Sequence, residues 1–170
     1  MTLRDPEEIL SFFEARRSIR AFTDRAVSDE DIALMVRAAS LAPTARNIQP
    51  WEFVVIRDKK RLKTLTDMVS PNGAMLGKAA VGILVFCKDT KYYLEDGCAA
   101  ITQALLAAAG LGLGACWIAG DKKDYASRVG AFCRAGEGYR LVGLIAVGHP
   151  NERPSPTKRD VKDMMHRETF

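Results

Sequence analysis

The chain has 170 residues, of which 48% are hydrophobic and 27% are charged, a composition typical of globular domains. We therefore expect one domain over 1–170, with an extended C-terminal tail from about residue 150. The longest apolar run, 79–87, is too short for a membrane span, and the N-terminus lacks the pattern of a signal peptide. A cytoplasmic protein with no membrane partner is expected. The net charge of +4 is mild and the arginines cluster in motifs, so no nucleic-acid partner is expected either.

Helix starts are predicted at three places in the first half of the chain, each at a residue that commonly caps a helix N-terminus. The first helix follows Asp5, the second runs from Ser28 until Pro43 stops it, and the third follows Asp58. A strand is predicted over 51–57, and residues 70–73 form a turn. The first helix is expected to bury an apolar stripe formed by Ile9, Leu10, Phe12 and Phe13.

Strands dominate the second half of the predicted core, together with one long helix over 95–109. The apolar run 81–87 predicts a strand that is covered on both faces. Further short strands are predicted over 116–118 and 141–147, with a helix around 123–133 between them. Because helices and strands do not alternate strictly, the pattern favours an α+β fold.

A basic motif follows the first helix. Arg16, Arg17 and Arg20 lie within five residues of one another and flank Ser18. In an extended segment, Arg16, Ser18 and Arg20 would lie on one side. Guanidinium and hydroxyl groups in such a row suit a phosphate, because arginine forms paired, charge-assisted hydrogen bonds to phosphate oxygens. The alternative is a solvated basic connector.

A polar loop precedes the strand 51–57. Its sequence, Ala-Pro-Thr-Ala-Arg-Asn-Ile-Gln-Pro-Trp over 42–51, is stiffened by two prolines. The side chains of Thr44, Asn47 and Gln49 offer hydrogen-bond donors and acceptors. The loop suits a ligand with a phosphate and a polyol or heteroaromatic edge. Trp51 is expected in the core.

Two other patterns argue against a dinucleotide-binding loop and against a metal site. The glycines at 110, 112 and 114 follow a helix and precede a strand, whereas a dinucleotide-binding loop needs the reverse order. Gly110 is therefore expected to end the helix, and the other two to allow close packing. The four cysteines are widely spaced without a nearby pair of histidines, so we expect buried, reduced thiols and no metal site.

Four blocks together resemble the flavin-dependent nitroreductase family. They are RRSIRAF at 16–22, APTARNIQPWEF at 42–53, LGLGACWIAG at 111–120, and VGHP at 147–150 with the Pro-rich Lys-Arg segment after it. The blocks occur in the family's order and cover most of the chain. The resemblance implies a central, mostly antiparallel sheet flanked by helices, in an intertwined homodimer with FMN sites at the interface.

The resemblance also implies which residues contact FMN. Arg16, Arg17 and Ser18 correspond to residues that hold the phosphate and ribityl chain, and Arg20 to a basic residue that approaches N1 and O2 of the flavin ring. A cation there would stabilise the negative charge of the reduced flavin. The other implied contacts are Pro43, Thr44, Ala45, Asn47, Gln49, Asn72, Trp117, Ile118, Ala119, Gly120, Lys158 and Arg159.

Several of these positions keep a second interpretation. Asn72 is explained equally well by its turn, and Lys158 and Arg159 by a solvated tail. Gln49 either contacts the flavin or supports its loop. A backbone N–H near Ala119 is implied to donate to flavin N5, but some relatives carry an acidic side chain at this position, so a carboxylate role is in doubt.

The implied activity is an FMN-dependent oxidoreductase with NADH or NADPH as electron donor and a nitroaromatic, quinone or similar electrophile as acceptor. No side chain is expected to be catalytic in its own right, because the flavin carries the redox chemistry. No segment is recognisable as a 2′-phosphate site, so NADH and NADPH both remain open. The connection 88–94 is short where larger members insert helices that cover the substrate. The resemblance therefore does not imply which substrate this chain reduces. The alternatives are a flavin-binding protein with little turnover, for storage or sensing, or a dedicated reductive dehalogenase or ene-type reductase.

Overall fold

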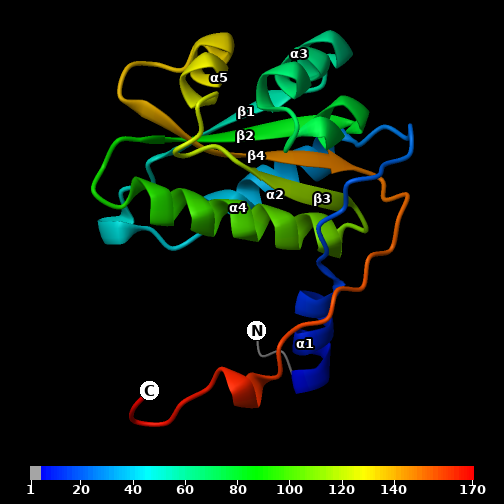
Figure 1. Cartoon of the computed structure of the whole chain (residues 1–170), viewed down its shortest axis with the longest axis vertical. Helices are drawn as coiled ribbons and strands as arrows, with labels where there is room; N and C mark the ends of the chain where they lie inside the picture. Colours follow the sequence, from blue (N-terminus) through cyan, green and yellow to red (C-terminus); the bar gives the residue numbers. More distant parts are fainter. Residues whose placement is uncertain (1–4) are drawn as a thin grey trace.

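Four antiparallel strands form the centre of the protein (Figure 1). The structure is a computed structural model, and it describes residues 5–170. Their spatial order is β1-β2-β4-β3, and each neighbouring pair is antiparallel. The strands are β1 (Trp51–Ile56), β2 (Val81–Lys88), β3 (Gly114–Ala119) and β4 (Tyr139–Gly148). The predicted antiparallel sheet is confirmed, with β1 and β3 as its edges.

Helices cover both faces of this sheet, as Figure 1 shows. On one face lie α2 (Asp29–Ser40) and α4 (Tyr93–Gly110), and on the other lie α3 (Lys59–Val69) and α5 (Ala126–Cys133). Successive side chains of β2 therefore enter different cores: Ile83 belongs to the α2 and α4 side, and Leu84 to the α3 and α5 side. The α+β fold class is confirmed, and the apolar run 81–87 is covered on both faces as predicted.

The predicted helix starts are confirmed by their caps. The side chain of Asp5 accepts a hydrogen bond from the N–H of Glu7 at the start of α1 (Pro6–Ala15). Ser28 caps α2 and Asp58 caps α3 in the same way. These bonds satisfy backbone donors that the first turn of a helix leaves unpaired. Trp51 is 7% exposed and belongs to the core, as expected.

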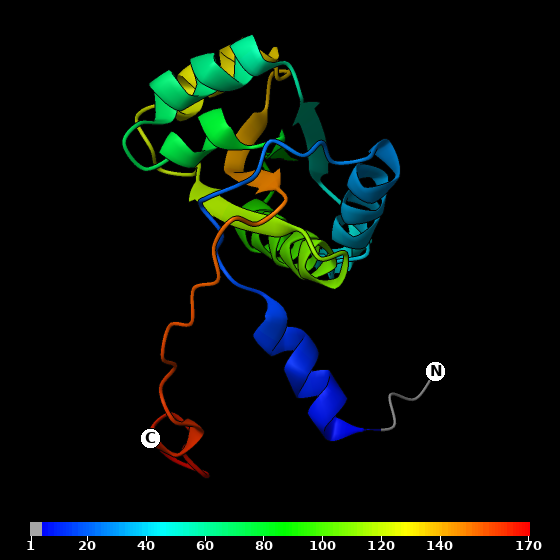
Figure 2. The ribbon, with the colours of Figure 1, turned by 90° about the vertical axis from the view of Figure 1, so that its right-hand side faces the viewer.

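The buried stripe predicted for α1 is wrong for the single chain. Leu10, Phe12 and Phe13 are 59%, 43% and 53% exposed, and α1 extends away from the body of the molecule (Figure 2). Its last turns touch α4, where the ring of Phe12 lies close to Gly110. The stripe has the helical spacing that was predicted, but one chain provides too little surface to cover it.

The C-terminal end of α4 also differs from its prediction. Gly110 is the last helical residue, and the left-handed residue that ends the helix is Gly112, with φ +70°. The N–H of Leu113 donates to the carbonyl of Ala108 at 2.8 Å, and the N–H of Gly112 donates to that of Ala109 at 3.0 Å. This is a Schellman motif with glycine at its positive-φ position. Gly114 allows close packing as expected, since a Cβ there would lie 2.7 Å from Ile19.

The tail after residue 150 is extended, as predicted, up to a single 3-10 turn, η3 (Val161–Asp163). It leaves the body on the same side as α1 (Figures 1 and 2). The four cysteines are free; Cys87 and Cys116 are buried, and Cys98 and Cys133 are half-buried. Burial raises the pKa of Cys87 to about 12, which keeps it a thiol at neutral pH. Within residues 5–170, no helix has both the length and the apolarity to cross a membrane.

Candidate cofactor site

A basic cavity of about 430 Å³ lies between the connector after α1 and the tail. It brings together five of the predicted site residues from the two ends of the chain. Its lining consists of Arg16, Arg17, Ser18, Arg20, Pro154, Ser155, Pro156 and Lys158. Within the described residues, none of its four cations forms an ion pair. The cavity therefore offers unneutralised positive charge and a hydroxyl group, which is what an anionic phosphate requires.

The connector is held in place by β3. Ser18 forms a parallel bridge with Ala115, and the N–H of Ile19 donates to the carbonyl of Ala115 at 3.0 Å. The side chain of Ile19 is buried against Gly114. An extended backbone with Ile19 buried turns Ser18 and Arg20 to the other side, toward the cavity. The predicted extended segment is thus confirmed, although Arg17 lines the cavity as well.

Glu152 attaches the tail to the same connector. Its carboxylate accepts the backbone N–H groups of Arg20 and Ala21 at 2.5 and 3.1 Å. The hydrogen bond from the Arg20 N–H, and then that from Ala21, hold the pKa of Glu152 below its usual value. The N–H of Asn151 also donates to the carbonyl of Ala21 at 2.9 Å. These contacts bring the tail, and with it Lys158, to the cavity. Sequence reasoning missed Glu152, because its partners are backbone groups more than 100 residues away.

Two of the other predicted contacts lie outside this cavity. Arg159 is exposed and donates to the carbonyl of Asp163 at 2.8 Å. Asn72 is exposed in the turn after α3, where the sequence predicted a turn. Neither residue lines the basic cavity within the single chain.

The loop 43–49, which includes η1 (Ala45–Asn47), lies at the N-terminal end of α4. The hydroxyl of Thr44 donates to Asp96 at 2.9 Å and accepts the N–H of Gln49 at 3.1 Å. The N–H of Ala45 donates to the other oxygen of Asp96 at 3.1 Å. Asp96, which is only 5% exposed, thus anchors the loop. It is a second residue that sequence reasoning missed, because Asp96 follows Glu95 in the first turn of α4 and the sequence does not show which of the two carboxylates is buried.

This anchorage separates the two predicted halves of the site within one chain. Arg16 and Arg17 lie beside Ala109, near the C-terminal end of α4, whereas the loop is bonded to Asp96. At 1.5 Å per helical residue, the two positions are about 20 Å apart along α4. In a single chain, the loop and the arginines do not meet.

The third predicted segment lies at the end of edge strand β3. Ile118 is 2% exposed, so that its side chain belongs to the core, whereas Trp117 is 36% exposed and Ala119 is exposed. The N–H of Gly120 already donates to the carbonyl of Val142 at 3.1 Å. A ligand at this edge therefore meets the open side of the β3 backbone and the Trp117 side chain.

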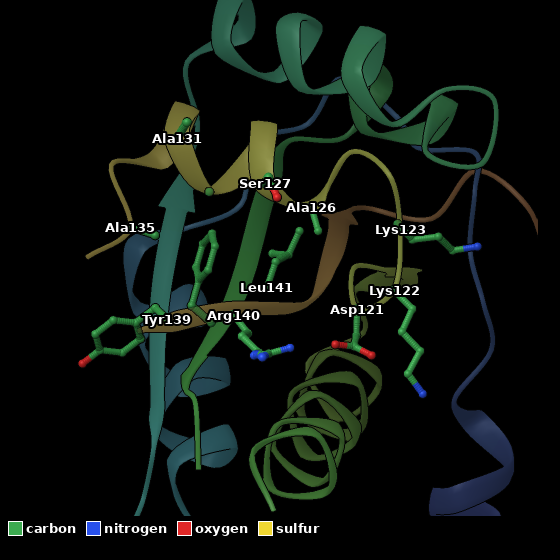
Figure 3. A pocket seen from close by; sticks show the side chains of 12 residues that line it. Asp121, Lys122, Lys123, Ala126, Ser127, Ala131, Ala135, Tyr139, Arg140 and Leu141 are labelled. Carbon is green, nitrogen blue, oxygen red and sulfur yellow. The ribbon is translucent and has the colours of Figure 1, made fainter. Parts of the chain in front are cut away.

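A larger cavity of about 460 Å³ lies under α5, beside the same end of β3 (Figure 3). Phe86 and Leu141 belong to its lining, and Lys122 and Lys123 point away from it in Figure 3. Its cation, Arg140, is paired with Asp89 at 2.8 Å. It contains none of the predicted cofactor contacts, so the basic cavity remains the candidate site.

Comparison with known proteins shows the family to which the chain belongs. A model of the nitroreductase family matches residues 13–84 and 71–149. A protein of Archaeoglobus fulgidus with the provisional name NADH dehydrogenase/NAD(P)H nitroreductase is 34% identical over 175 residues, which cover 96% of this chain and 99% of that protein.

Two crystal structures share the whole fold. One, from Bacteroides thetaiotaomicron and with the same provisional name, has a TM-score of 0.91 at 30% identity and covers 96% of this chain and 98% of its own. The other, a provisionally named nitroreductase from Desulfovibrio desulfuricans in complex with FMN, has a TM-score of 0.82 at 32% identity and covers 98% and 99%. The family model and these relatives span nearly the whole sequence, and the chain belongs to the nitroreductase family.

Proposed function

We propose that this protein is an NAD(P)H-dependent FMN oxidoreductase that reduces a nitroaromatic, a quinone or a similar electrophile. The observation that carries the proposal is the basic cavity, where cations without ion pairs converge from the connector and the tail. The name of the Archaeoglobus fulgidus relative and the FMN complex of the Desulfovibrio desulfuricans relative support the donor and the cofactor.

The residues of the cavity fit the phosphate end of FMN. Arg16, Arg17 and Lys158 supply charge-assisted donors, and Ser18 supplies a hydroxyl. We assign Arg20 to N1 and O2 of the ring, where a fixed cation would favour the form of the flavin that carries negative charge. Bound FMN would accept hydride from the nicotinamide and deliver it to the acceptor.

We also propose that the site is completed in a homodimer. The loop 43–49 and the arginines lie at opposite ends of α4, so a twofold partner is needed to bring a loop to each arginine cluster. The exposed stripe of α1, with Leu10, Phe12 and Phe13, offers apolar surface for the same partner. The loop would then present Asn47 and the backbone near Pro43 to the partner's flavin.

Cofactor analysis and rapid mixing test this function. The purified protein should release one FMN per chain, and not FAD, because the cavity offers a site for one monophosphate. Mixing the FMN-loaded protein with NADH or NADPH should bleach the flavin absorbance rapidly, and a quinone or nitroaromatic should restore it. Recovery of FAD would disprove the proposal that FMN is the cofactor. Tight FMN binding with bleaching no faster than for free FMN would favour the alternative of a flavin-binding protein with little turnover.

A further inference from the structure

A second, smaller cavity of about 130 Å³ lies between the loop 43–49 and the short connection before α4. Its lining consists of Ala45, Arg46, Ile48, Thr90, Lys91 and Tyr92. Neither Arg46 nor Lys91 is recognisable as a ligand residue in the sequence alone. The fold places a cation from each of them, Arg46 and Lys91, around one hollow.

Arg46 has a backbone conformation that is unusual for its residue type. Its φ is +54°, in the left-handed region where a side chain costs about 1–2 kcal/mol. The loop is held there by Asp96, whose two oxygens accept hydrogen bonds from Thr44 and the N–H of Ala45. The carboxylate that holds the loop is thus buried and bonded to other donors. It anchors Arg46 without neutralising it.

Lys91 and Tyr92 form the other side of this cavity. The ammonium group of Lys91 lies 5.1 Å from the centre of the Tyr92 ring, and Tyr92 as a residue is 43% exposed. Within residues 5–170, neither Lys91 nor Arg46 forms an ion pair. Arg140, by contrast, is neutralised by Asp89, which lies at the start of the same connection, directly after β2. The cavity therefore has two cations without ion pairs, beside a tyrosine that is partly exposed.

These features fit a phosphate attached to an aromatic base. The hollow has the size of a phosphate group rather than that of a flavin, and two cations on its rim match a phosphate dianion. A base can stack on an exposed tyrosine ring next to a cation. The loop 43–49 is also the segment proposed to reach the partner's flavin, which would place this cavity beside the entrance to the active site.

We infer that Arg46 and Lys91 bind the 2′-phosphate of NADPH, with the adenine against Tyr92, and that this protein prefers NADPH to NADH. The inference rests on the proposed function, since it assigns the donor of that same site. The 2′-phosphate is the only group that distinguishes the two donors. Its recognition should therefore change the reaction with NADPH and leave that with NADH unchanged.

Stopped-flow reduction of the bound flavin tests the preference. The second-order rate constant for NADPH should exceed that for NADH in the wild-type protein. Arg46→Asn and Lys91→Gln should each lower the NADPH constant about tenfold, the factor for one interaction of about 1.4 kcal/mol, and leave the NADH constant within about twofold. Asparagine tolerates positive φ, so Arg46→Asn keeps the loop conformation. Arg46→Lys should retain most of the preference.

The matched control is Lys60→Gln, which removes one exposed cation from α3 on the opposite face of the sheet. It should change neither constant. Equal rates of the wild-type protein with NADH and NADPH, or equal losses with both donors in the variants, would overturn the inference.

Calorimetry separates a failure of this inference from a failure of the proposed function. Adenosine 2′,5′-bisphosphate and AMP carry the distinguishing ends of NADPH and NADH without the nicotinamide. The bisphosphate should bind the FMN-loaded protein at least about tenfold more tightly than AMP, and this advantage should disappear in Arg46→Asn. If neither donor reduces the flavin but this difference is found, the proposed function fails and the phosphate site stands. Equal binding of the two nucleotides rejects the site.

Discussion

At the residue scale, two carboxylates position the segments that carry the candidate ligands. Asp96 holds the loop 43–49, and Glu152 holds the tail to the arginine connector. Neither carboxylate forms an ion pair with the arginines of the basic cavity, so the positive charge of these guanidinium groups is not neutralised, although those of Arg17 and Arg20 donate to nearby backbone carbonyls. Glu152 accepts two backbone N–H groups, and Asp96 accepts one backbone N–H and the hydroxyl of Thr44. Such hydrogen bonds fix the path of a chain without removing the charge of a basic side chain.

Replacing Glu152 should weaken the binding of the phosphate group of FMN. In Glu152→Ala the tail loses its bonds to the N–H groups of Arg20 and Ala21 and keeps the bond from the Asn151 N–H, so Lys158 is held less firmly at the cavity. We expect a higher dissociation constant for FMN and an unchanged one for riboflavin, which lacks the phosphate, measured by quenching of flavin fluorescence. Glu137→Ala, which removes an exposed carboxylate elsewhere, is the control. An equal loss for both flavins would mean that Glu152 supports the fold as a whole.

The same contact predicts a pH dependence. The pKa of Glu152 is lowered in the folded protein. The contribution of its carboxylate to FMN binding is therefore complete above the ordinary glutamate pKa of about 4.3. It is lost as the pH falls through the lowered pKa. The difference in FMN affinity between the wild type and Glu152→Ala should therefore be constant from pH 7 down to about 5. It should shrink only below about pH 4.3.

At the scale of elements, α4 links the two halves of the site. Its first turn anchors the loop 43–49 through Asp96, and its end lies beside the arginine connector. The Schellman motif at Gly112 sets where the helix stops and β3 begins. The position of β3 in turn sets that of the connector, because Ser18 and Ile19 are bonded to Ala115.

Two glycines provide a matched test of this helix end. Gly112→Ala places a side chain at φ +70° and should lower the free energy of unfolding by about 1 kcal/mol. Gly130→Ala lies within α5, where a Cβ meets nothing within 4 Å, and should raise it by up to about 1 kcal/mol. Denaturant unfolding of FMN-free protein measures both. Equal effects of the same sign would contradict the distinct roles of the two glycines.

At the scale of the whole molecule, the single chain leaves apolar and charged surfaces uncovered. The stripe of α1 is exposed, and the loop 43–49 and the arginines are separated by most of α4. These features have one common explanation, a twofold partner that covers the stripe and joins the two halves of the site.

Mixed dimers can test this assembly. Arg16→Ala and Asn47→Ala should each weaken FMN binding; for Arg16→Ala the loss should be about 1.5–3 kcal/mol, the range for a hydrogen bond to a charged group. In a composite dimer of the two variants, one site collects both changes and the other collects neither. Co-expression with two affinity tags should therefore recover one tight FMN site per heterodimer, counted by flavin titration. Heterodimers without a tight site would place the loop and the arginines of one site in the same chain.

The sequence by itself determined the features that depend on near neighbours. The helix caps Asp5, Ser28 and Asp58 act within three residues, and the apolar run of β2 requires burial on both faces wherever it lies. The basic motif at 16–20 could be recognised in the same way, because charge and hydroxyl groups are visible in the residues themselves. For the caps and for β2 the predictions and the structure agree.

Only the tertiary structure decided which distant groups meet. The contact of Glu152 with Arg20, the anchorage of Thr44 by Asp96 and the pairing of Arg46 with Lys91 around one cavity join segments that the sequence keeps apart. The exposure of the α1 stripe is of the same kind, since burial depends on a surface that a helix does not itself provide. Periodicity states which face of a helix is apolar, but packing alone decides what covers it.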